Sequence, residues 1–338
     1  MRRMQRQVLC VISWLLSGVL AAALFLGDMV YGANKTPVSV HGALNVDGTK
    51  LVDKNGDSYR LKGVSTHGIS WYPEYINKEA FRTMRDEWGV NCVRLAMYTA
   101  EYNGYCVGGD ENKKVLLRKV DEGVAYATEL GMYVIIDWHN LSDGNPKTYQ
   151  KKAVSFFNRM AKKYKDQDNV IYEICNEPNG DTVWKEIKSY AKTVIKTIRK
   201  QDKDAIIIVG TPTWSQDVDV ASESPITGYD NLMYAFHFYA GTHQASYRKK
   251  VTTAINNGLP VFVSEFGITD ALGNGSVNTK EGAAWYQFLK KNGISCVAWN
   301  LSNKNESSAL LKSSCKRTSG WKKSDLSDWG KWLVKTYE

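Results

Sequence analysis

The chain has 338 residues, of which 43% are hydrophobic, 12% aromatic and 23% charged, with 27 glycines and 7 prolines. This composition excludes a disordered, collagen-like or coiled-coil protein. The formal net charge of +9 invites a nucleic-acid hypothesis. However, lysines alternate with acidic residues in stretches such as 162–168, and no basic motif with stacking aromatics occurs. We therefore expect solvated helix faces and no nucleic-acid partner.

The first 32 residues are expected to be separate from the folded domain. Arg2, Arg3 and Arg6 precede an uncharged apolar run over residues 8–27, and small residues follow at 32–33. This pattern is typical of a cleaved secretory signal. The run is longer than the usual h-region, so an uncleaved membrane anchor is the alternative. Both interpretations predict export, with a single catalytic domain over residues 33–338 whose net charge is +7, because three arginines and one aspartate are removed.

The five cysteines of the predicted domain fall into two groups. Three of the five in the predicted domain lie in apolar runs, where cysteine usually behaves as a small hydrophobe. Cys106 and Cys315 fall in predicted loops, and an exported protein permits a disulfide between them. No spacing rule requires that pair, so the disulfide stays an open possibility.

The predicted elements begin with a β-hairpin over residues 38–60, indicated by the turns Asp47-Gly48 and Asn55-Gly56. Short strand-like runs then alternate with longer helical patterns. The strand-like runs are 61–66, 92–98, 133–139, 170–177, 205–211, 232–239, 260–266 and 295–301. The helical patterns are 78–88, 113–130, 149–164, 183–200, 244–256, 279–291 and 325–335. Several of them end at a glycine, as a helix C-cap often does.

This alternation predicts an α/β fold, a (β/α)8 TIM barrel with a short N-terminal β-hairpin. Continuous apolar strands separated by helices indicate a parallel sheet covered on both faces. Eight such units are what a closed barrel requires. A doubly wound open sheet is the alternative, but it leaves the number of strands unexplained.

Strong polar residues stand at or near the ends of the predicted strands. A barrel builds its site at the carboxyl ends of its strands, so these residues are candidates for chemistry. They are Arg94, His139, Asn176, Glu177, His237, Tyr239 and Glu265. Glu177 and Glu265 end the fourth and seventh strands, across the barrel mouth from one another. Two facing carboxyl groups suit glycoside hydrolysis, whereas salt bridges at the barrel rim are the structural alternative.

Aromatic residues follow several of the same strands. Trp71 and Tyr72 come after the first strand, Trp214 after the fifth, and Trp299 ends the eighth. Flat aromatic faces can stack on pyranose rings, so a line of them predicts a polysaccharide-binding cleft. Trp138 lies inside a strand, and we expect it to pack between the barrel and the helices.

Two other classes of protein use similar residues. A metal-dependent barrel hydrolase would use His67, His139 and His237, but no His-x-His pair or ligating aspartate accompanies them. A non-catalytic carbohydrate-binding protein would use the tryptophans, but it has no need of two facing glutamates. We therefore predict an enzyme without metal or cofactor.

The motifs around these residues resemble those of a known family. The segments Cys92-Val-Arg94-Leu, Asp137-Trp-His139, Ile174-Cys-Asn176-Glu177-Pro178, His237-Phe-Tyr239, Ser264-Glu265-Phe-Gly267 and Trp299-Asn-Leu-Ser are similar to those of glycoside hydrolase family 5. The stretches from Gly210 to Asp217 and from Trp299 to Ser308 resemble its subfamily 2, which consists mainly of bacterial endo-β-1,4-glucanases. The resemblance runs from about residue 38 to the C-terminus.

The resemblance implies roles for particular residues. Glu177 matches the family's acid/base and Glu265 its nucleophile, supported by Arg94, His139, Asn176, His237 and Tyr239. The residues that match glucose-binding positions are His67, Trp71, Tyr72, Tyr98, Ala271, Trp299, Lys304 and Glu306. Trp214, chosen above for its place at a strand exit, completes the predicted binding residues. Phe266 departs from the family, where tryptophan is common, and we expect the chemistry to tolerate this.

The implied reaction is retaining hydrolysis of internal β-1,4-glucosidic bonds of cellulose and related β-glucans. The alternative within the family is a main activity on mannan, xyloglucan or mixed-linkage glucan. Beyond the polysaccharide, no obligate protein partner is expected, and the protein is expected to be a monomer.

Overall fold

The computed structural model describes residues 35–338, so the predicted signal segment lies outside the described residues. Within this range, no helix combines the length and the apolar character needed to cross a membrane.

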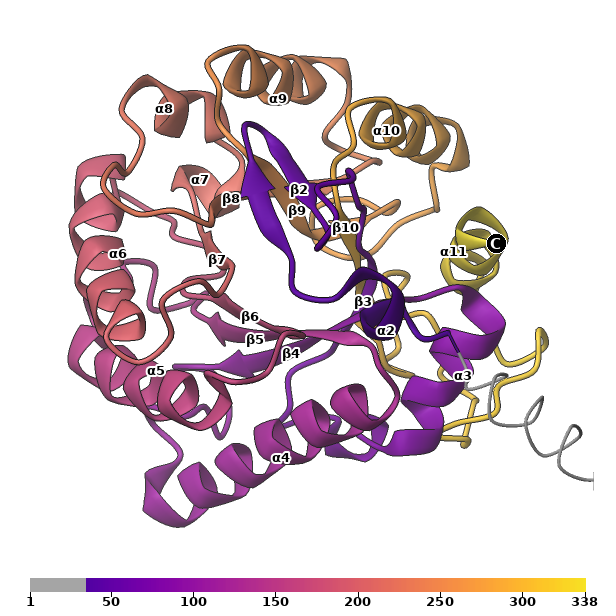
Figure 1. The fold of residues 1–338 in the computed structure, drawn as a ribbon. Coiled ribbons are helices and arrows are strands. Elements are labelled where there is room, and N and C mark those ends of the chain that lie inside the picture. The colour runs from indigo at the N-terminus through magenta and orange to yellow at the C-terminus, as the bar shows by residue number, and fades with distance from the viewer. Residues whose placement is uncertain (1–34) are drawn as a thin grey trace, which may run out of the picture.

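Eight parallel strands close into a barrel, which confirms the predicted fold (Figure 1). Each strand pairs with the next along the chain, and the last pairs with the first. The strands are β3 (Lys62–Thr66), β4 (Cys92–Tyr98), β5 (Tyr133–His139), β6 (Val170–Glu173), β7 (Ile207–Val209), β8 (Leu232–Tyr239), β9 (Val261–Gly267) and β10 (Cys296–Leu301).

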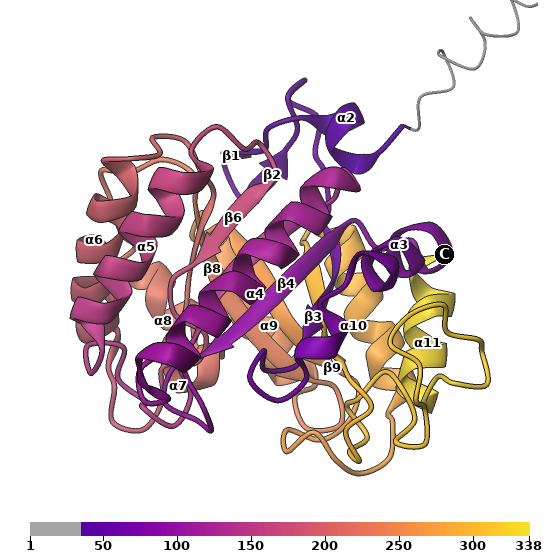
Figure 2. The ribbon, with the colours of Figure 1, turned by 90° about the horizontal axis from the view of Figure 1, so that it is seen from below.

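Helices surround the barrel and cover its outer face (Figures 1 and 2). The long ones are α3 (Lys78–Trp88), α4 (Gly109–Glu129), α5 (Gln150–Tyr164), α6 (Trp184–Arg199), α9 (Ala245–Asn256), α10 (Thr279–Lys291) and α11 (Asp328–Tyr337). Short helical segments that the sequence did not predict are η1 (Pro73–Tyr75), α7 (Pro212–Ser215) and α8 (Val218–Glu223).

Several predicted boundaries were wrong, each for a local reason. The fourth strand ends at Glu173 and not at Glu177, because the backbone N–H of Asn176 turns away to the Asn140 side chain and to Trp138 O. The last helix begins at Asp328, after the Ser327 side chain caps it by accepting the N–H of Gly330.

The predicted hairpin is shorter than expected. The segment 37–41 forms a one-turn helix, α2 (Pro37–His41), because Thr36 caps it and Pro37 suits its first turn. Strands β1 (Asn45–Asp47) and β2 (Lys50–Val52) then form the hairpin around Asp47-Gly48. The hairpin lies across the amino end of the barrel in Figure 1. Leu44 and Leu51 are buried there among the first inward-pointing residues of the barrel strands.

Alternate residues along each barrel strand point into the barrel and form layers. On β5 the order is Tyr133 and Ile135, then Asp137, then His139. The lowest residues belong to an apolar cluster that the hairpin covers. Above it lies a fully buried polar layer, which consists of Arg94, Asp137, Glu173, His237 and Ser264. The barrel is therefore apolar at the hairpin end and polar toward the opposite end.

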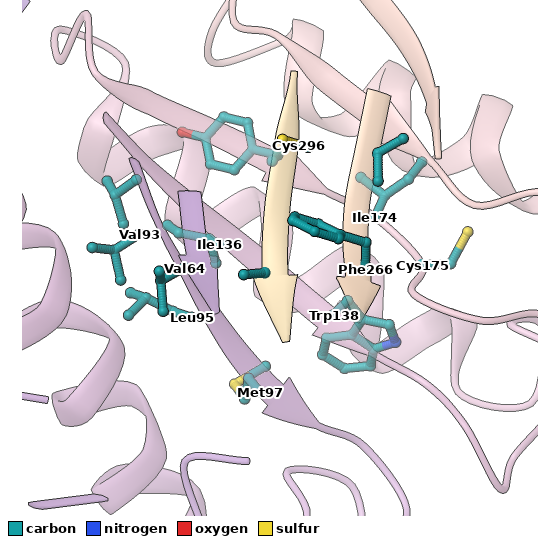
Figure 3. Close-up of a cluster of buried hydrophobic side chains, with 14 of the residues drawn as sticks. Val64, Val93, Leu95, Met97, Ile136, Trp138, Ile174, Cys175, Phe266 and Cys296 are labelled. Carbon is teal, nitrogen blue, oxygen red and sulfur yellow. The ribbon is translucent and has the colours of Figure 1, made fainter. Parts of the chain in front are cut away.

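The outward-pointing residues pack against the helices (Figure 3). Trp138 is fully buried there and contacts Tyr105 and Phe156, which confirms its predicted place between barrel and helices. Phe266 also points into this layer (Figure 3). Its ring centroid lies 5.4 Å from that of Phe238 and 5.5 Å from that of Trp329. The residue that departs from the family is therefore part of the helical packing and not of the cleft.

All five cysteines of the described residues are free. The disulfide that the sequence left open between Cys106 and Cys315 does not form. The Cys315 thiol is buried and donates to the carbonyl of Arg317. Cys106 lies in the loop before α4, next to Lys152 of α5. The two residues belong to separate loops, and no contact joins their side chains.

Candidate active site

A cleft of about 790 Å³ lies over the polar layer, at the carboxyl ends of the strands. Every predicted site residue lines it except Arg94 and Asn176, which are fully buried beneath its floor. The predicted residues in its wall are His67, Trp71, Tyr72, Tyr98, His139, Glu177, Trp214, His237, Tyr239, Glu265, Ala271, Trp299, Lys304 and Glu306. The fold thus brings together residues that are more than 200 positions apart in the sequence.

Arg94 forms hydrogen bonds and ion pairs with the side chains at the floor of the cleft. Its Nε donates to Glu173 Oε2 at 2.7 Å, and its Nη2 donates to Asn176 Oδ1 at 2.7 Å. Nη2 also lies 3.0 Å from Asp137 Oδ2, and Nη1 donates to Glu265 Oε2 at 3.3 Å. Burial alone would lower the pKa of Arg94, but these carboxylates raise it above its usual range. The guanidinium is therefore a permanent buried cation.

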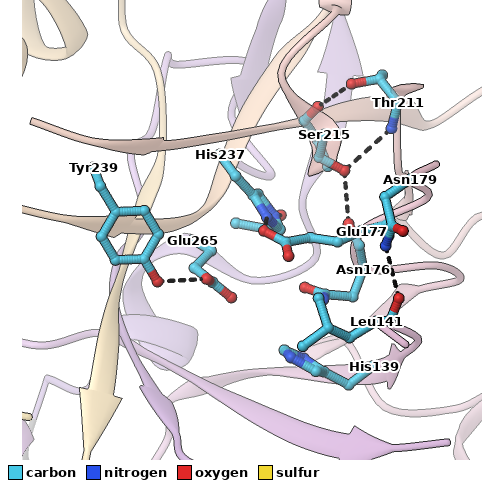
Figure 4. Close-up of polar contacts among 12 residues, drawn as sticks. His139, Leu141, Asn176, Glu177, Asn179, Thr211, Ser215, His237, Tyr239 and Glu265 are labelled. Atoms are coloured by element: carbon cyan, nitrogen blue, oxygen red, sulfur yellow. Dashed lines mark hydrogen bonds and ion pairs between the residues drawn. The ribbon is translucent and has the colours of Figure 1, made fainter. Parts of the chain in front are cut away.

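Glu265 and Glu177 face one another in the cleft (Figure 4). One carboxylate oxygen of each lies within 4.8 Å of the other and of a His237 nitrogen. Glu265 Oε1 accepts a hydrogen bond from the Tyr239 hydroxyl at 2.7 Å, in addition to the Arg94 contact. Burial and the like charge of Glu177 raise the pKa of Glu265, against the opposing charges of His237 and Arg94. For two carboxyl groups this close, the state of lowest electrostatic energy is the one in which they share a single proton.

The two glutamates differ in the hydrogen-bond donors that contact them. Glu265 receives two charged or hydroxyl donors, so its ionised form is stabilised. Glu177 has one side-chain partner, His237 Nδ1, at 2.9 Å from its Oε1. These donors favour the ionised form of Glu265, so the proton that the two glutamates share lies with the pair formed by Glu177 and His237.

The two histidines of the floor differ in their surroundings. Burial would lower the pKa of His237, but its interactions with Glu173 and Glu177 raise it to about 9. The Nδ1 of His139 lies 2.6 Å from Asp137 Oδ2, so Asp137 orients its ring. Burial and the charge of Arg94 lower the pKa of His139 to about 4, which leaves it neutral near pH 7.

Aromatic rings form the walls of the cleft. Trp299 lies nearly parallel to His139, with ring centroids 5.2 Å apart and an interplanar angle of 16°. Trp71 meets Tyr98 edge to face at 4.8 Å. Beside them, Lys304 pairs with Glu306 at 2.6 Å. These flat faces and charged groups suit a ligand with both apolar faces and hydroxyl groups.

Trp214 follows β7, which lies across the closed barrel from β3, and is 43% exposed in the cleft. Thr213, Trp214 and Ser215 all have positive φ values of 54° to 56°, which non-glycine residues rarely adopt. Hydrogen bonds hold this turn: Ser215 Oγ donates to Asn176 O (Figure 4), and the backbone N–H of Trp214 donates to Pro178 O. Strained backbone of this kind persists at functional sites, where the surroundings fix it.

The hydrogen-bond partners of the predicted residues were not predicted from the sequence. Glu173 and Ser264 belong to the buried polar layer, and Asp137 orients His139, yet none had been assigned a role. A signal existed, because Glu173 is the single charged residue of β6 and ends this otherwise uncharged strand. Glu101 also lines the cleft and was not predicted.

Among residues 35–338, one group of side chains is close enough to hold a metal ion, and it is Glu177, His237 and Glu265. This is not the histidine set that a metal-dependent hydrolase would use. Most of the donor atoms are already engaged, because Arg94 and Tyr239 donate to Glu265 and His237 contacts Glu177. The group therefore fits a pair of reacting carboxylates better than a metal centre.

Comparison with known proteins agrees with this geometry. The model of the cellulase family, glycosyl hydrolase family 5, matches residues 52–305. The chain is 50% identical to endoglucanase A of Butyrivibrio fibrisolvens over 89% of its own length and 70% of that protein. It is 46% identical to an endoglucanase of Clostridium saccharobutylicum, over 96% of this chain and 71% of the relative.

Solved structures are similar as well. The cellulase Cel5C_n superposes with a TM-score of 0.87 at 41% identity, covering 90% of this chain and 94% of that one. The catalytic domain of Thermobifida fusca endoglucanase Cel5A, in complex with cellotetraose, has a TM-score of 0.84 at 34% identity, over 89% of this chain and 99% of that one. With its barrel, its facing glutamates and these relatives, the chain belongs to glycosyl hydrolase family 5, the cellulase family.

Proposed function

We propose that this protein is a retaining endo-β-1,4-glucanase that hydrolyses internal bonds of cellulose and related β-glucans. The observation that carries the proposal is the spacing of Glu177 and Glu265, since one carboxylate oxygen of each lies within 4.8 Å of the other. Retaining glycosidases hold their carboxyl groups about 5 to 5.5 Å apart, whereas inverting enzymes leave room for a water. The endoglucanase relatives at 50% and 46% identity support the choice of substrate.

In the proposed first step, the ionised Glu265 attacks the anomeric carbon while Glu177 gives its proton to the leaving oxygen. Arg94 and Tyr239 hold the charge on Glu265 until the bond forms. In the second step, Glu177 takes a proton from water, which attacks the glycosyl-enzyme and frees Glu265. Esterification has removed the charge of Glu265, so its repulsion no longer opposes the new charge on Glu177.

The remaining cleft residues would bind the sugars. Beneath the floor of the cleft, the Asn176 amide accepts from Arg94 and donates to Asn140 O, and its second N–H is the group that would meet a sugar hydroxyl beside the reacting carbon. Trp299 and His139 would flank the glucose unit that is attacked, and His67, Trp71, Tyr72, Tyr98, Ala271, Lys304 and Glu306 the units beyond it. Trp214, across the cleft, would stack on the leaving part of the chain.

The two glutamates can be tested separately with a dinitrophenyl cellobioside, whose leaving group needs no protonation. In Glu177→Ala, Glu265 should still form the glycosyl-enzyme, so a burst precedes slow turnover. Azide should then accelerate turnover and give the β-glycosyl azide. In Glu265→Ala no burst is possible, and azide should give the α-azide. The opposite pattern in the two variants would interchange their roles.

Two measurements on the unaltered enzyme complete the test. Proton NMR of early products should show the β-anomer first, and an initial α-anomer contradicts the two-step reaction. Initial rates on carboxymethylcellulose, lichenan, glucomannan and xylan should be highest on the first two. Activity that a strong chelator abolishes would instead favour a metal at Glu177, His237 and Glu265.

We also propose that the protein is exported, as a secreted or membrane-anchored enzyme. The support is the sequence of residues 1–32, with three arginines before a long apolar run. N-terminal sequencing of active protein from culture medium should begin near residue 33. Activity confined to the membrane fraction would favour the uncleaved anchor, and activity confined to the cytoplasm contradicts export.

A further inference from the structure

Tyr102, in the turn after β4, is an exposed aromatic residue beside the cleft. It is 64% exposed, and among the large apolar side chains of residues 35–338 only Leu272 is more exposed. Tyr102 is not one of the residues that line the cleft, but its ring lies against Trp71, which is. The two ring centroids are 6.2 Å apart, with an interplanar angle of 27°. Tyr102 therefore continues the aromatic wall of the cleft and is not an isolated exposed ring.

Tyr102 is the outermost member of a series of neighbouring aromatic rings. Between ring centroids, Trp299 lies 5.2 Å from His139, and His139 lies 4.1 Å from Tyr98. Tyr98 lies 4.8 Å from Trp71, which contacts Tyr102 in turn. The first three rings are buried and the last is largely exposed. The series leads from the proposed point of cleavage to the outer rim of the cleft, on the side of the glucose units beyond the one that is attacked.

Hydrogen bonds fix the turn that carries Tyr102. Asn103 adopts a positive φ of 49°, which favours a tight turn. Its carbonyl oxygen accepts from Ser70 Oγ at 3.2 Å and from Asn112 Nδ2 at 2.5 Å. Because Ser70 directly precedes Trp71, this contact also fixes Tyr102 relative to the Trp71 ring. A ring that is already held in place loses little entropy when a ligand stacks on it.

A second set of contacts fixes the same turn from the other side. Glu101 Oε1 accepts the backbone N–H of Ser142, in the loop after β5, at 2.7 Å. Gly104 allows a close approach of the chain to itself, since a Cβ there would lie 2.5 Å from the carbonyl oxygen of Thr99. The turn is therefore bound to the loops after both neighbouring strands, and the position of Tyr102 at the rim is defined by the fold.

From this placement we infer that Tyr102 forms a further sugar-binding position, which holds one glucose unit of a long β-glucan beyond the unit that contacts Trp71. The inference rests on the proposed glucanase function and concerns the length of chain that the enzyme prefers. A tyrosine ring offers a flat face to a pyranose ring, and few of its torsions have to be fixed. The competing role is a structural one, in which Tyr102 only supports the Trp71 ring.

The chain length at which binding weakens distinguishes the two roles. The measurement is titration calorimetry with cellobiose to cellohexaose, on Glu177→Gln enzyme that binds these sugars without hydrolysing them. In this background, Trp71→Ala should first weaken binding at a certain chain length. Tyr102→Ala should first weaken it at a chain one glucose unit longer, with Kd rising about three- to tenfold.

The other outcomes contradict the inference. A loss in Tyr102→Ala that begins at the same chain length as in Trp71→Ala means that Tyr102 only supports Trp71. Unchanged binding at every length up to cellohexaose removes Tyr102 from the binding surface. If no oligosaccharide binds even before Tyr102 is changed, the proposed function fails, and the inference fails with it.

Three further variants separate stacking from other effects. Val107→Ala is the matched control, because Val107 is a 51% exposed residue of the same connection and does not line the cleft. It should leave every Kd unchanged. Tyr102→Phe keeps the flat ring and should bind like the tyrosine, whereas Tyr102→Leu should match Tyr102→Ala. A leucine that binds as tightly as phenylalanine at this position contradicts stacking.

The products of the active enzyme give an independent test. If a position on the non-reducing side is lost, a bound chain shifts by one unit toward the reducing side. With cellohexaose labelled at its reducing end, the main labelled product of Tyr102→Ala should therefore be one glucose unit longer than that of the unaltered enzyme. The same distribution of labelled products from both enzymes overturns the inference.

Discussion

Glu265 depends on two donors of different kinds, and the hydroxyl of Tyr239 is the one that can be removed without leaving a buried charge unpaired. Its bond to Oε1 is 2.7 Å long, and Arg94 contacts the other oxygen at 3.3 Å. A hydrogen bond to a charged group is worth about 1.5 to 3 kcal/mol. The hydroxyl therefore supports a sizeable part of the nucleophile's ionisation.

For Tyr239→Phe, we expect kcat/KM to fall by about 10- to 100-fold, which is the loss of one such bond. The sign of the pH effect follows from the form that is stabilised. Removing a donor to the ionised carboxylate raises the pKa of Glu265 further, so the acidic limb of the kcat/KM profile should move to higher pH. A limb that moves to lower pH, or stays in place, contradicts this assignment.

Substitution of Trp299 tests whether the aromatic wall of the cleft binds sugar. In Trp299→Ala, the sugar at the reacting carbon loses its flat partner beside His139. We expect kcat/KM on cello-oligosaccharides to fall by about tenfold or more, since 1.4 kcal/mol is one decade. Trp332→Ala, in the helical layer beside Trp329, is the control and should keep the ratio. Equal values for both variants would remove Trp299 from the proposed subsite.

At the scale of elements, the hairpin β1–β2 and the cleft lie at opposite ends of the barrel. Leu51 of β2 is 1% exposed and packs on the lowest inward residues of the strands. Leu51→Ala should lower the free energy of unfolding by about 2 to 5 kcal/mol and leave kcat unchanged. Val40→Ala, at a 39% exposed position of the neighbouring α2, should change stability by less than about 0.5 kcal/mol. A lower kcat at full folding in Leu51→Ala would show that the two ends are coupled.

The strands illustrate what the sequence could predict. The runs 92–98 and 133–139 match β4 and β5 residue for residue, because both faces of a parallel strand are buried and most of its residues are therefore apolar. The run 170–177 was too long by four residues, since Asn176 finds hydrogen-bond partners on the loop after β5 that only the folded barrel brings near.

The active site, too, could be predicted only in part from the sequence. Glu177 and Glu265 could be found from their motifs and their places near strand ends. The link from Glu173 through Ser264 to His237 could not, because it joins residues of three strands whose side chains meet only inside the closed barrel. Likewise, spacing along the chain gave no means to decide whether Cys106 and Cys315 meet.

At the scale of the whole molecule, the net charge of the protein should affect the binding of anionic and neutral polymers differently. The full chain carries +9, whereas the cleft is lined by four glutamates, one lysine and the raised-pKa ring of His237; the glutamates and the lysine are Glu101, Glu177, Glu265, Glu306 and Lys304. A neutral glucan responds to the cleft alone. An anionic polymer is also attracted by the field of the whole protein, which salt screens over about 10 Å at 0.1 M.

We therefore expect the KM for carboxymethylcellulose to rise about two- to fivefold between 0.02 and 0.5 M sodium chloride, as long-range attraction is screened. The KM for neutral lichenan should change little over the same range. A parallel rise on both polymers would assign the salt effect to the cleft or to the fold, and not to net charge.

The position of Arg94 restricts how this barrel can change over evolutionary time. Its guanidinium joins side chains from β5, β6 and β9 and from the loop after β6, and all of them except Glu265, which reaches the cleft, are fully buried. Loss of any one carboxylate leaves a buried charge less well compensated, at a cost of several kcal/mol. Substitutions in this set are therefore strongly epistatic, and an altered floor can arise only through several coordinated changes. New substrate preferences in descendants of this enzyme should instead accumulate in the loops around the cleft, where single changes are tolerated one at a time.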